Sequence, residues 1–92
     1  MDAKLIVYEL SNLDQYHKVL VNRALFGYID NSNKGAYQYK RKGILSEMRH
    51  VRLLRGVVIV RPGDKNKIIN TLNKHGVKSK VFNIAVKQSM LY

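Results

Sequence analysis

Residues 56–76 read GVVIVRPGDKNKIINTLNKHG and hold the two patterns that decide the fold class. The β-branched run Val57–Val60 is typical of a strand, which we expect over residues 56–61, and the Pro-Gly pair at residues 62–63 ends it. Asp64 then offers an N-cap for a helix. Apolar residues follow at helical spacing: Ile68, Ile69 and Leu72. Because glycine favours the position just after a helix, Gly76 predicts where this helix ends.

The first 33 residues predict another strand and another helix. Residues 4–10 (KLIVYEL) are rich in branched and aromatic side chains, as in a strand buried on both faces. Ser11 and Asp14 have the spacing of a capping box, which marks a helix start. The apolar stripe of this helix comprises Leu13, Tyr16, Leu20 and Ala24. Gly27 fits the C-terminal stop, so we expect a helix over residues 12–26.

The middle of the chain predicts a loop and a strand. Residues 30–35 (DNSNKG) are turn formers and predict a loop. Residues 36–45 alternate in polarity and predict the second strand of the sheet, with a bulge at Gly43. A rival interpretation pairs residues 26–29 back onto that strand as a short hairpin. Residues 46–55 are irregular and basic, and we expect a loop or one or two helical turns there.

Residues 77–86 alternate again and predict a fourth strand, followed by a flexible tail over residues 87–92. The order is βαββαβ within a single basic domain, residues 1–92. This order predicts an α+β fold, a ferredoxin-like sandwich whose four-stranded antiparallel sheet carries both helices on one face. The other sheet face is then left to solvent, a partner chain or a ligand.

Composition excludes several classes of protein. The chain has 92 residues, 46% of them hydrophobic, which suits one small domain with a core. It has no cysteine, so disulfides, thiolate zinc sites and cysteine nucleophiles are excluded. No apolar run approaches the ~20 residues that span a bilayer, and the N-terminus does not resemble a signal peptide. We therefore expect a soluble, cytoplasmic protein without a membrane partner.

Charge is the strongest indication of function. Lys and Arg number 17 against 6 Asp and Glu, which gives a formal charge of +11. Residues 1–33 are close to neutral, whereas residues 34–61 contain eight bases and a single acid, Glu47. A surface charged only for solubility would mix both signs. This excess of positive charge therefore favours a polyanionic partner, and nucleic acid is the leading candidate.

The first candidate binding site is the second strand, where aromatic and basic residues alternate. Its members are Tyr37, Tyr39, Lys40, Arg41 and Lys42. Aromatic rings two apart share one strand face and stack on unpaired bases, while the cations follow the phosphates. The alternative is that both tyrosines are ordinary core or edge residues with hydroxyls at the surface.

The second candidate is the basic segment that follows. Its members are Arg49, His50, Arg52 and Arg55, and Arg61 adds a further cation beyond the next strand. The planar guanidinium fork suits phosphate, and a basic loop can follow a phosphate backbone. The alternative is solvated loop charge with no partner.

Catalysis has little support in the sequence. The histidines His17, His50 and His75 lack metal-ligand spacing, the acids are single, and no P-loop is present. We therefore expect no enzyme, no metal and no cofactor, but a nucleic-acid-binding domain that prefers RNA or single-stranded DNA to duplex DNA. Two alternatives stay open. One is a homodimeric interaction or assembly subunit that uses the open sheet face, and the other is a metal-independent ribonuclease with His50, Tyr39 and lysines.

Overall fold

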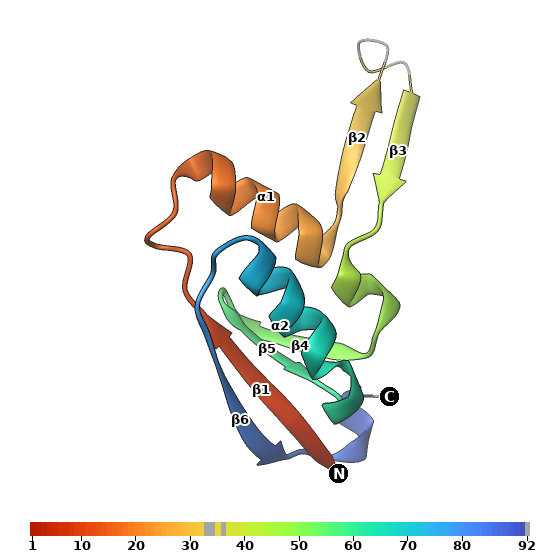
Figure 1. Ribbon diagram of the computed structural model, residues 1–92. Helices are drawn as coiled ribbons and strands as arrows, with labels where there is room; N and C mark the ends of the chain where they lie inside the picture. Colours follow the sequence, from red (N-terminus) through yellow and green to blue (C-terminus); the bar gives the residue numbers. More distant parts are fainter. Residues whose placement is uncertain (33–34, 36, 92) are drawn as a thin grey trace.

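The computed structural model describes residues 1–32, 35 and 37–91 (Figure 1). Its body is a four-stranded antiparallel sheet with the order β4-β5-β1-β6. The strands are β1 (Asp2–Tyr8), β4 (His50–Leu54), β5 (Val57–Val60) and β6 (Ser79–Ala85). The helices α1 (Gln15–Phe26) and α2 (Lys65–Lys74) lie together on one face. This α+β architecture is compatible with a ferredoxin-like arrangement.

The main core lies between this sheet and the two helices. Ile6 of β1 pairs with Val58 of β5, and both side chains are fully buried. They pack against Val21 and Leu25 of α1 and against Ile68 and Leu72 of α2. Each such side chain contributes roughly 1.5–3 kcal/mol when it is fully removed from water. These contacts hold the helices on the sheet.

Helix α1 begins later than the sequence predicts. Asp14, not Ser11, is the N-cap, and its Oδ1 accepts a hydrogen bond from the backbone N–H of His17 at 2.8 Å. That bond and a second one from the His17 ring lower the pKa of Asp14. The expected stripe is wrong at Tyr16, which is exposed because Val21 and Leu25 face the core instead. Gly27 ends the helix with a φ of 81°, as predicted.

The prediction for the second strand of the sheet is wrong. Residues Tyr37–Arg41 form β3, which pairs only with β2 (Tyr28–Ser32) in a separate hairpin that projects from the body (Figure 1). The main sheet takes its second strand from β4, in the segment expected to be irregular. Every residue of β3 is exposed, whereas β4 supplies Val51 to a second apolar cluster. The rival hairpin interpretation is therefore confirmed in its pairing but not in its bounds, since the partner strand covers Tyr28–Ser32 and not residues 26–29.

Two smaller predictions in this region also change. The loop expected over residues 30–35 is partly strand, since Asp30 and Asn31 belong to β2; Asn33, Lys34 and Ala36 lie outside the described residues. Gly43 is no bulge but precedes a short 3-10 helix, Ile44–Glu47, in which Leu45 is fully buried. A Cβ on Gly43 would clash with the backbone of Leu25 and Gly27, so the two ends of the hairpin meet in close backbone contact.

The last residues pack against the sheet face away from the helices. Leu91, in the 3-10 helix Gln88–Leu91, is buried with Ala3 and Ile59. Arg61 Nη2 donates a hydrogen bond to the Leu91 carbonyl oxygen at 3.2 Å. The segment expected to be a flexible tail is thus structured through Leu91, and Tyr92 lies outside the described residues. No helix in the described part of the chain is long and apolar enough to cross a membrane.

Candidate nucleic-acid interface

One face of the hairpin gathers three tyrosines. The register pairs Tyr28 with Arg41 and Asp30 with Tyr39, and residues directly opposite each other share a face. Tyr37 lies two residues before Tyr39 and points the same way. The exposed fractions of these rings are 37% for Tyr28, 54% for Tyr37 and 50% for Tyr39. The interpretation of Tyr37 and Tyr39 as core residues is therefore wrong, whereas the alternative that they are exposed edge residues without a partner stays open.

Guanidinium groups lie against two of these rings. The Arg23 Cζ atom, from the last turn of α1, is 4.4 Å from the ring centroid of Tyr28. The Arg41 Cζ atom is 5.7 Å from the ring centroid of Tyr39, and Arg41 Nη2 also lies 3.3 Å from Asp30 Oδ2. Arginines therefore lie beside tyrosine rings along this face, which also carries Asp30 opposite Tyr39. We call it the tyrosine face, and its binding candidates are Arg23, Tyr28, Arg41, Tyr39 and Tyr37.

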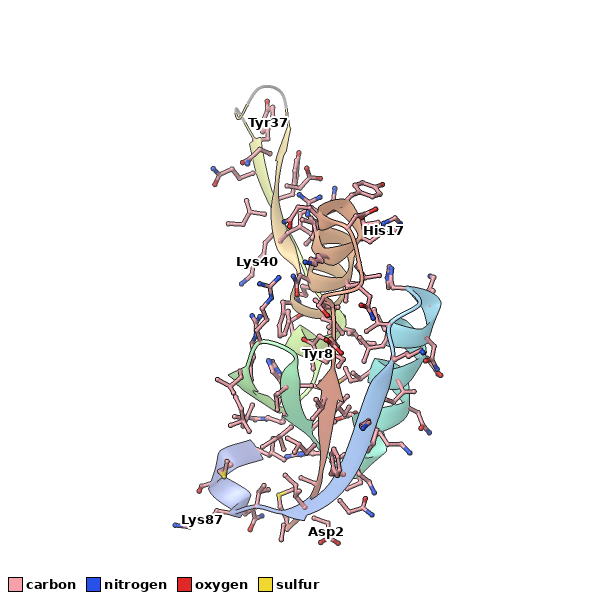
Figure 2. All side chains as sticks on the ribbon, turned by 90° about the vertical axis from the view of Figure 1, so that its left-hand side faces the viewer. Asp2, Tyr8, His17, Tyr37, Lys40 and Lys87 are labelled. Atoms are coloured by element: carbon pink, nitrogen blue, oxygen red, sulfur yellow. The ribbon has the colours of Figure 1, made fainter. Side chains whose placement is uncertain are left out.

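Lysines lie on the other side of the hairpin and at its base. Lys40 is paired with Ile29 on the face opposite the tyrosines, and both are exposed. Lys42 follows β3 and is exposed as well. Figure 2 shows Tyr37 near the free end of the hairpin and Lys40 further down, between Tyr37 and the buried Tyr8 of the body. The first candidate set is thus brought together on one projecting element.

Two members of the second candidate set, His50 and Arg52, lie in the edge strand β4 and not in a loop. Arg52 of β4 places its Cζ atom 4.1 Å from the ring centroid of Phe26, the last residue of α1. This contact brings Arg52 to the base of the hairpin, since Tyr28 begins β2 two residues later. Arg49 is exposed just before β4. His50 is half-buried, with its Nδ1 3.1 Å from the Met48 carbonyl oxygen.

Arg55 and Arg61 do not join the hairpin cations. Arg55 lines a cleft of about 290 Å³ beside the buried Tyr8 and Lys18. Burial raises the pKa of the Tyr8 hydroxyl, and the charges of Arg52 and Arg55 oppose that rise. Arg61 is bound to the C-terminal turn, at the end of the body opposite the hairpin (Figure 1). Its position favours a structural role over a binding role.

Two residues of the tyrosine face, Arg23 and Tyr28, were missing from the sequence-based candidates. Tyr28 was assigned to the hairpin only in the rival interpretation, and its pairing with Arg41 follows from that register. Arg23 is in the last turn of α1, so its distance from Tyr28 depends on how Gly27 turns the chain. Following the rival hairpin residue by residue would have identified Tyr28, but not Arg23.

The structure does not assemble the residues considered for catalysis. His50 lies in the main sheet and Tyr39 on the hairpin, and none of the described hydrogen bonds or ion pairs joins them. Among the residues that the structure describes, no group of three His, Asp or Glu side chains could hold a metal ion. Comparison with known proteins found no matching family model, no matching curated sequence and no matching solved structure.

Proposed function

We propose that this protein is a nucleic-acid-binding domain that takes single-stranded RNA or DNA on the tyrosine face of its hairpin. The observation that carries the proposal is the row of three exposed tyrosine rings, two of them in contact with guanidinium groups. The strand order β4-β5-β1-β6, with both helices on one face, supports a ferredoxin-like fold as the platform.

Stacking is the interaction that this face favours. An unpaired base that stacks on an aromatic ring contributes about 1–3 kcal/mol, and every base has a face to offer. The guanidinium groups of Arg23 and Arg41 pack against two of the rings and limit the rotamers of these tyrosines. Less side-chain conformational entropy is therefore lost when a base binds. The Arg23 guanidinium can donate hydrogen bonds to phosphate oxygens, and Arg41, whose Nε and Nη2 donate to Asp30, has further N–H groups to offer. Adjacent side chains can therefore contact the bases and the phosphate backbone of the nucleic acid.

The exposure of the hairpin is itself an argument for binding. A two-stranded hairpin is at best marginally stable in water by itself. This one buries no side chain of β3, and Ile29 on its other face is 62% exposed. Its aromatic residues therefore add little to the core of the body. A role in contacting a partner accounts for three tyrosines in such a place.

Single strands suit this face better than duplexes. A two-stranded ribbon does fit the major groove of B-DNA, where it reads base edges. Tyrosine rings, however, stack on base faces, and those faces are covered by neighbouring base pairs within a duplex. Lysines such as Lys40 can contact the phosphates of a single strand and of a duplex alike. The preference for single strands therefore depends on the tyrosine rings.

The test is equilibrium binding of the purified protein to matched single-stranded RNA, single-stranded DNA and duplex DNA at several salt concentrations. With roughly five phosphates contacted, log K against log salt should have a slope near −3.5 for single strands. At a given salt concentration the single strands should bind more tightly than the duplex. Absence of binding at low salt, or tighter binding to the duplex, would contradict the proposal.

A homodimeric assembly subunit is the second candidate function. The specific observation in its favour is apolar exposure on the body, where Phe82 of β6 is 49% exposed and Leu54 of β4 is 71% exposed. The C-terminal turn covers only part of the open sheet face, around Ala3 and Ile59. The two functions are compatible, since the hairpin and the body present different surfaces.

A further inference from the structure

Strand β6 is an outer edge of the main sheet. It pairs with β1 over all seven residues, from Asp2 opposite Ala85 to Tyr8 opposite Ser79, without a register shift. On its other side no strand of the described chain is bonded to it. In an antiparallel strand the backbone groups point alternately to the two sides, so this edge presents N–H and C=O groups ready to pair.

The two outer edges of the sheet differ in how they are protected. Strand β4 has five residues, an irregularity between Arg52 and Leu54, one arginine within it (Arg52) and an arginine just beyond each end (Arg49 and Arg55). Bulges and charges of this kind prevent pairing with other chains. Strand β6 is regular and contains one charged residue, Lys80, after which residues 81–86 (VFNIAV) carry no charge. Val81 and Phe82 are 37% and 49% exposed there.

We propose that β6 pairs with the β6 strand of a second copy, antiparallel and centred on Phe82, so that the two sheets join into one of eight strands. Phe82 is opposite Leu5, on the sheet face away from the helices. The centred register brings the two Phe82 rings together and extends the apolar row of Leu5 across the dimer. It also covers the large apolar side chain that the single chain leaves exposed on this strand.

The same register avoids a conflict of charge. Lys80 faces Ile84 of the partner subunit, and Val81 faces the partner's Asn83, so no lysine lies opposite a lysine. A register centred on Lys80 would put the two ammonium groups opposite each other, which is destabilising. Each copy carries +11, so the copies repel at long range and added salt should strengthen the dimer. Salt weakens nucleic-acid binding, so the two associations are distinguishable.

The absence of cysteine from the chain allows a direct test of this register. Single variants Phe82→Cys, Val81→Cys and Asn83→Cys are purified free of nucleic acid and oxidised at high protein concentration. Phe82→Cys should form a disulfide-linked dimer, because paired Cβ atoms lie within about 4.5–5.5 Å. Val81→Cys and Asn83→Cys should cross-link when mixed and not when oxidised singly. Leu54→Cys on the other edge is the control, since Leu54 is even more exposed (71%) than Phe82 (49%).

Light scattering of the unmodified protein in high salt gives the second measurement. The expected mass at high concentration is twice the 10.6 kDa of one chain. Phe82→Lys should return the mass to that of one chain while its thermal melting stays that of a folded protein, since two facing ammonium groups repel. A single-chain mass at every concentration, or cross-linking of Phe82→Cys no greater than that of Leu54→Cys, would overturn the proposal. Neither measurement involves nucleic acid, so its outcome is independent of the hairpin's function.

Discussion

The main sheet and the hairpin are both antiparallel β-structure, yet they differ in what covers them. In the main sheet Ile6, Val58 and Val60 are fully buried beneath two helices. In the hairpin every residue of β3 is exposed, and no helix in the described part of the chain covers either face (Figure 1). Apolar burial is the dominant favourable contribution to folding. The body therefore supplies most of the stability, and the side chains of β3 contribute little to it.

Tyrosine shows the same difference at the level of one residue type. Tyr8 of β1 is 5% exposed, and its hydroxyl has no hydrogen-bond partner among the described residues. Tyr37 and Tyr39 are half-exposed on the hairpin. The first ring serves packing, whereas the other two are available to stack on a ligand. Substitutions in the two regions should therefore have effects of different kinds.

Val58→Asp should have the largest effect on the body. It places a carboxylate at a fully buried position in the middle of the sheet. Burying an unpaired charge costs several kcal/mol, which is comparable with the ~5 kcal/mol or more that stabilise a small domain. Circular dichroism should show an unfolded chain at room temperature. A cooperative melt close to that of the unmodified protein would refute the assigned core.

Gly43→Ala tests how the hairpin is attached to the body. The added Cβ would clash with the backbone of Leu25 and Gly27 at the base of the hairpin. Overpacking of this kind costs about 1–3 kcal/mol, which urea unfolding should detect. Gly63→Ala is the matched control, because its Cβ would meet open space. Equal stabilities of the two variants would contradict the close backbone contact.

Arg52→Ala probes the contact between the body and the hairpin base. Its guanidinium lies on the Phe26 ring, and such a contact at an exposed site contributes about 0.5–1 kcal/mol. Arg49→Ala removes a neighbouring exposed arginine and should change stability by about 0.5 kcal/mol or less. Urea unfolding of both variants side by side makes the comparison. A larger loss for Arg49→Ala would contradict the role assigned to Arg52.

Tyr8→Phe should have the smallest effect on the free energy of unfolding, and any change should be stabilising. It removes a buried hydroxyl that finds no partner among the described residues while keeping the ring. Leaving such a group unsatisfied costs about 1–3 kcal/mol at most, so its removal should be neutral or mildly stabilising. A clear fall in melting temperature would show that this hydroxyl makes an interaction in solution.

Local patterns made part of this fold predictable. The β-branched run of β5, the apolar stripe of α2 and the stop at Gly27 depend on residues close together in sequence, and all three predictions are confirmed. The sequence also predicts the strand at Tyr37–Arg41, but it places this strand in the main sheet and not in a separate hairpin. Alternation indicates that one face of the strand is aromatic, but not which strand pairs with it or what covers that face.

The remaining differences depend on contacts between distant residues. Strand β4, HVRLL, lies in a segment with arginines on both sides and no regular alternation, and it is a strand because β5 pairs with it. Leu91 is buried because Ala3 and Ile59 leave a place for it, which no pattern near residue 91 indicates. Arg23 reaches Tyr28 only through the turn at Gly27. Tertiary contacts of this kind override local propensity.

The most direct test of the separation between body and hairpin measures binding and melting on the same samples of two double variants. Tyr37→Ala with Tyr39→Ala should bind single-stranded oligonucleotide more weakly by about 1–3 kcal/mol per stacked base, with unchanged salt slope and unchanged melting temperature. Tyr37→Phe with Tyr39→Phe keeps both rings and should bind nearly as well as the unmodified protein. Undiminished binding by the alanine variant, or a fall in its melting temperature that accounts for its weaker binding, would contradict the account.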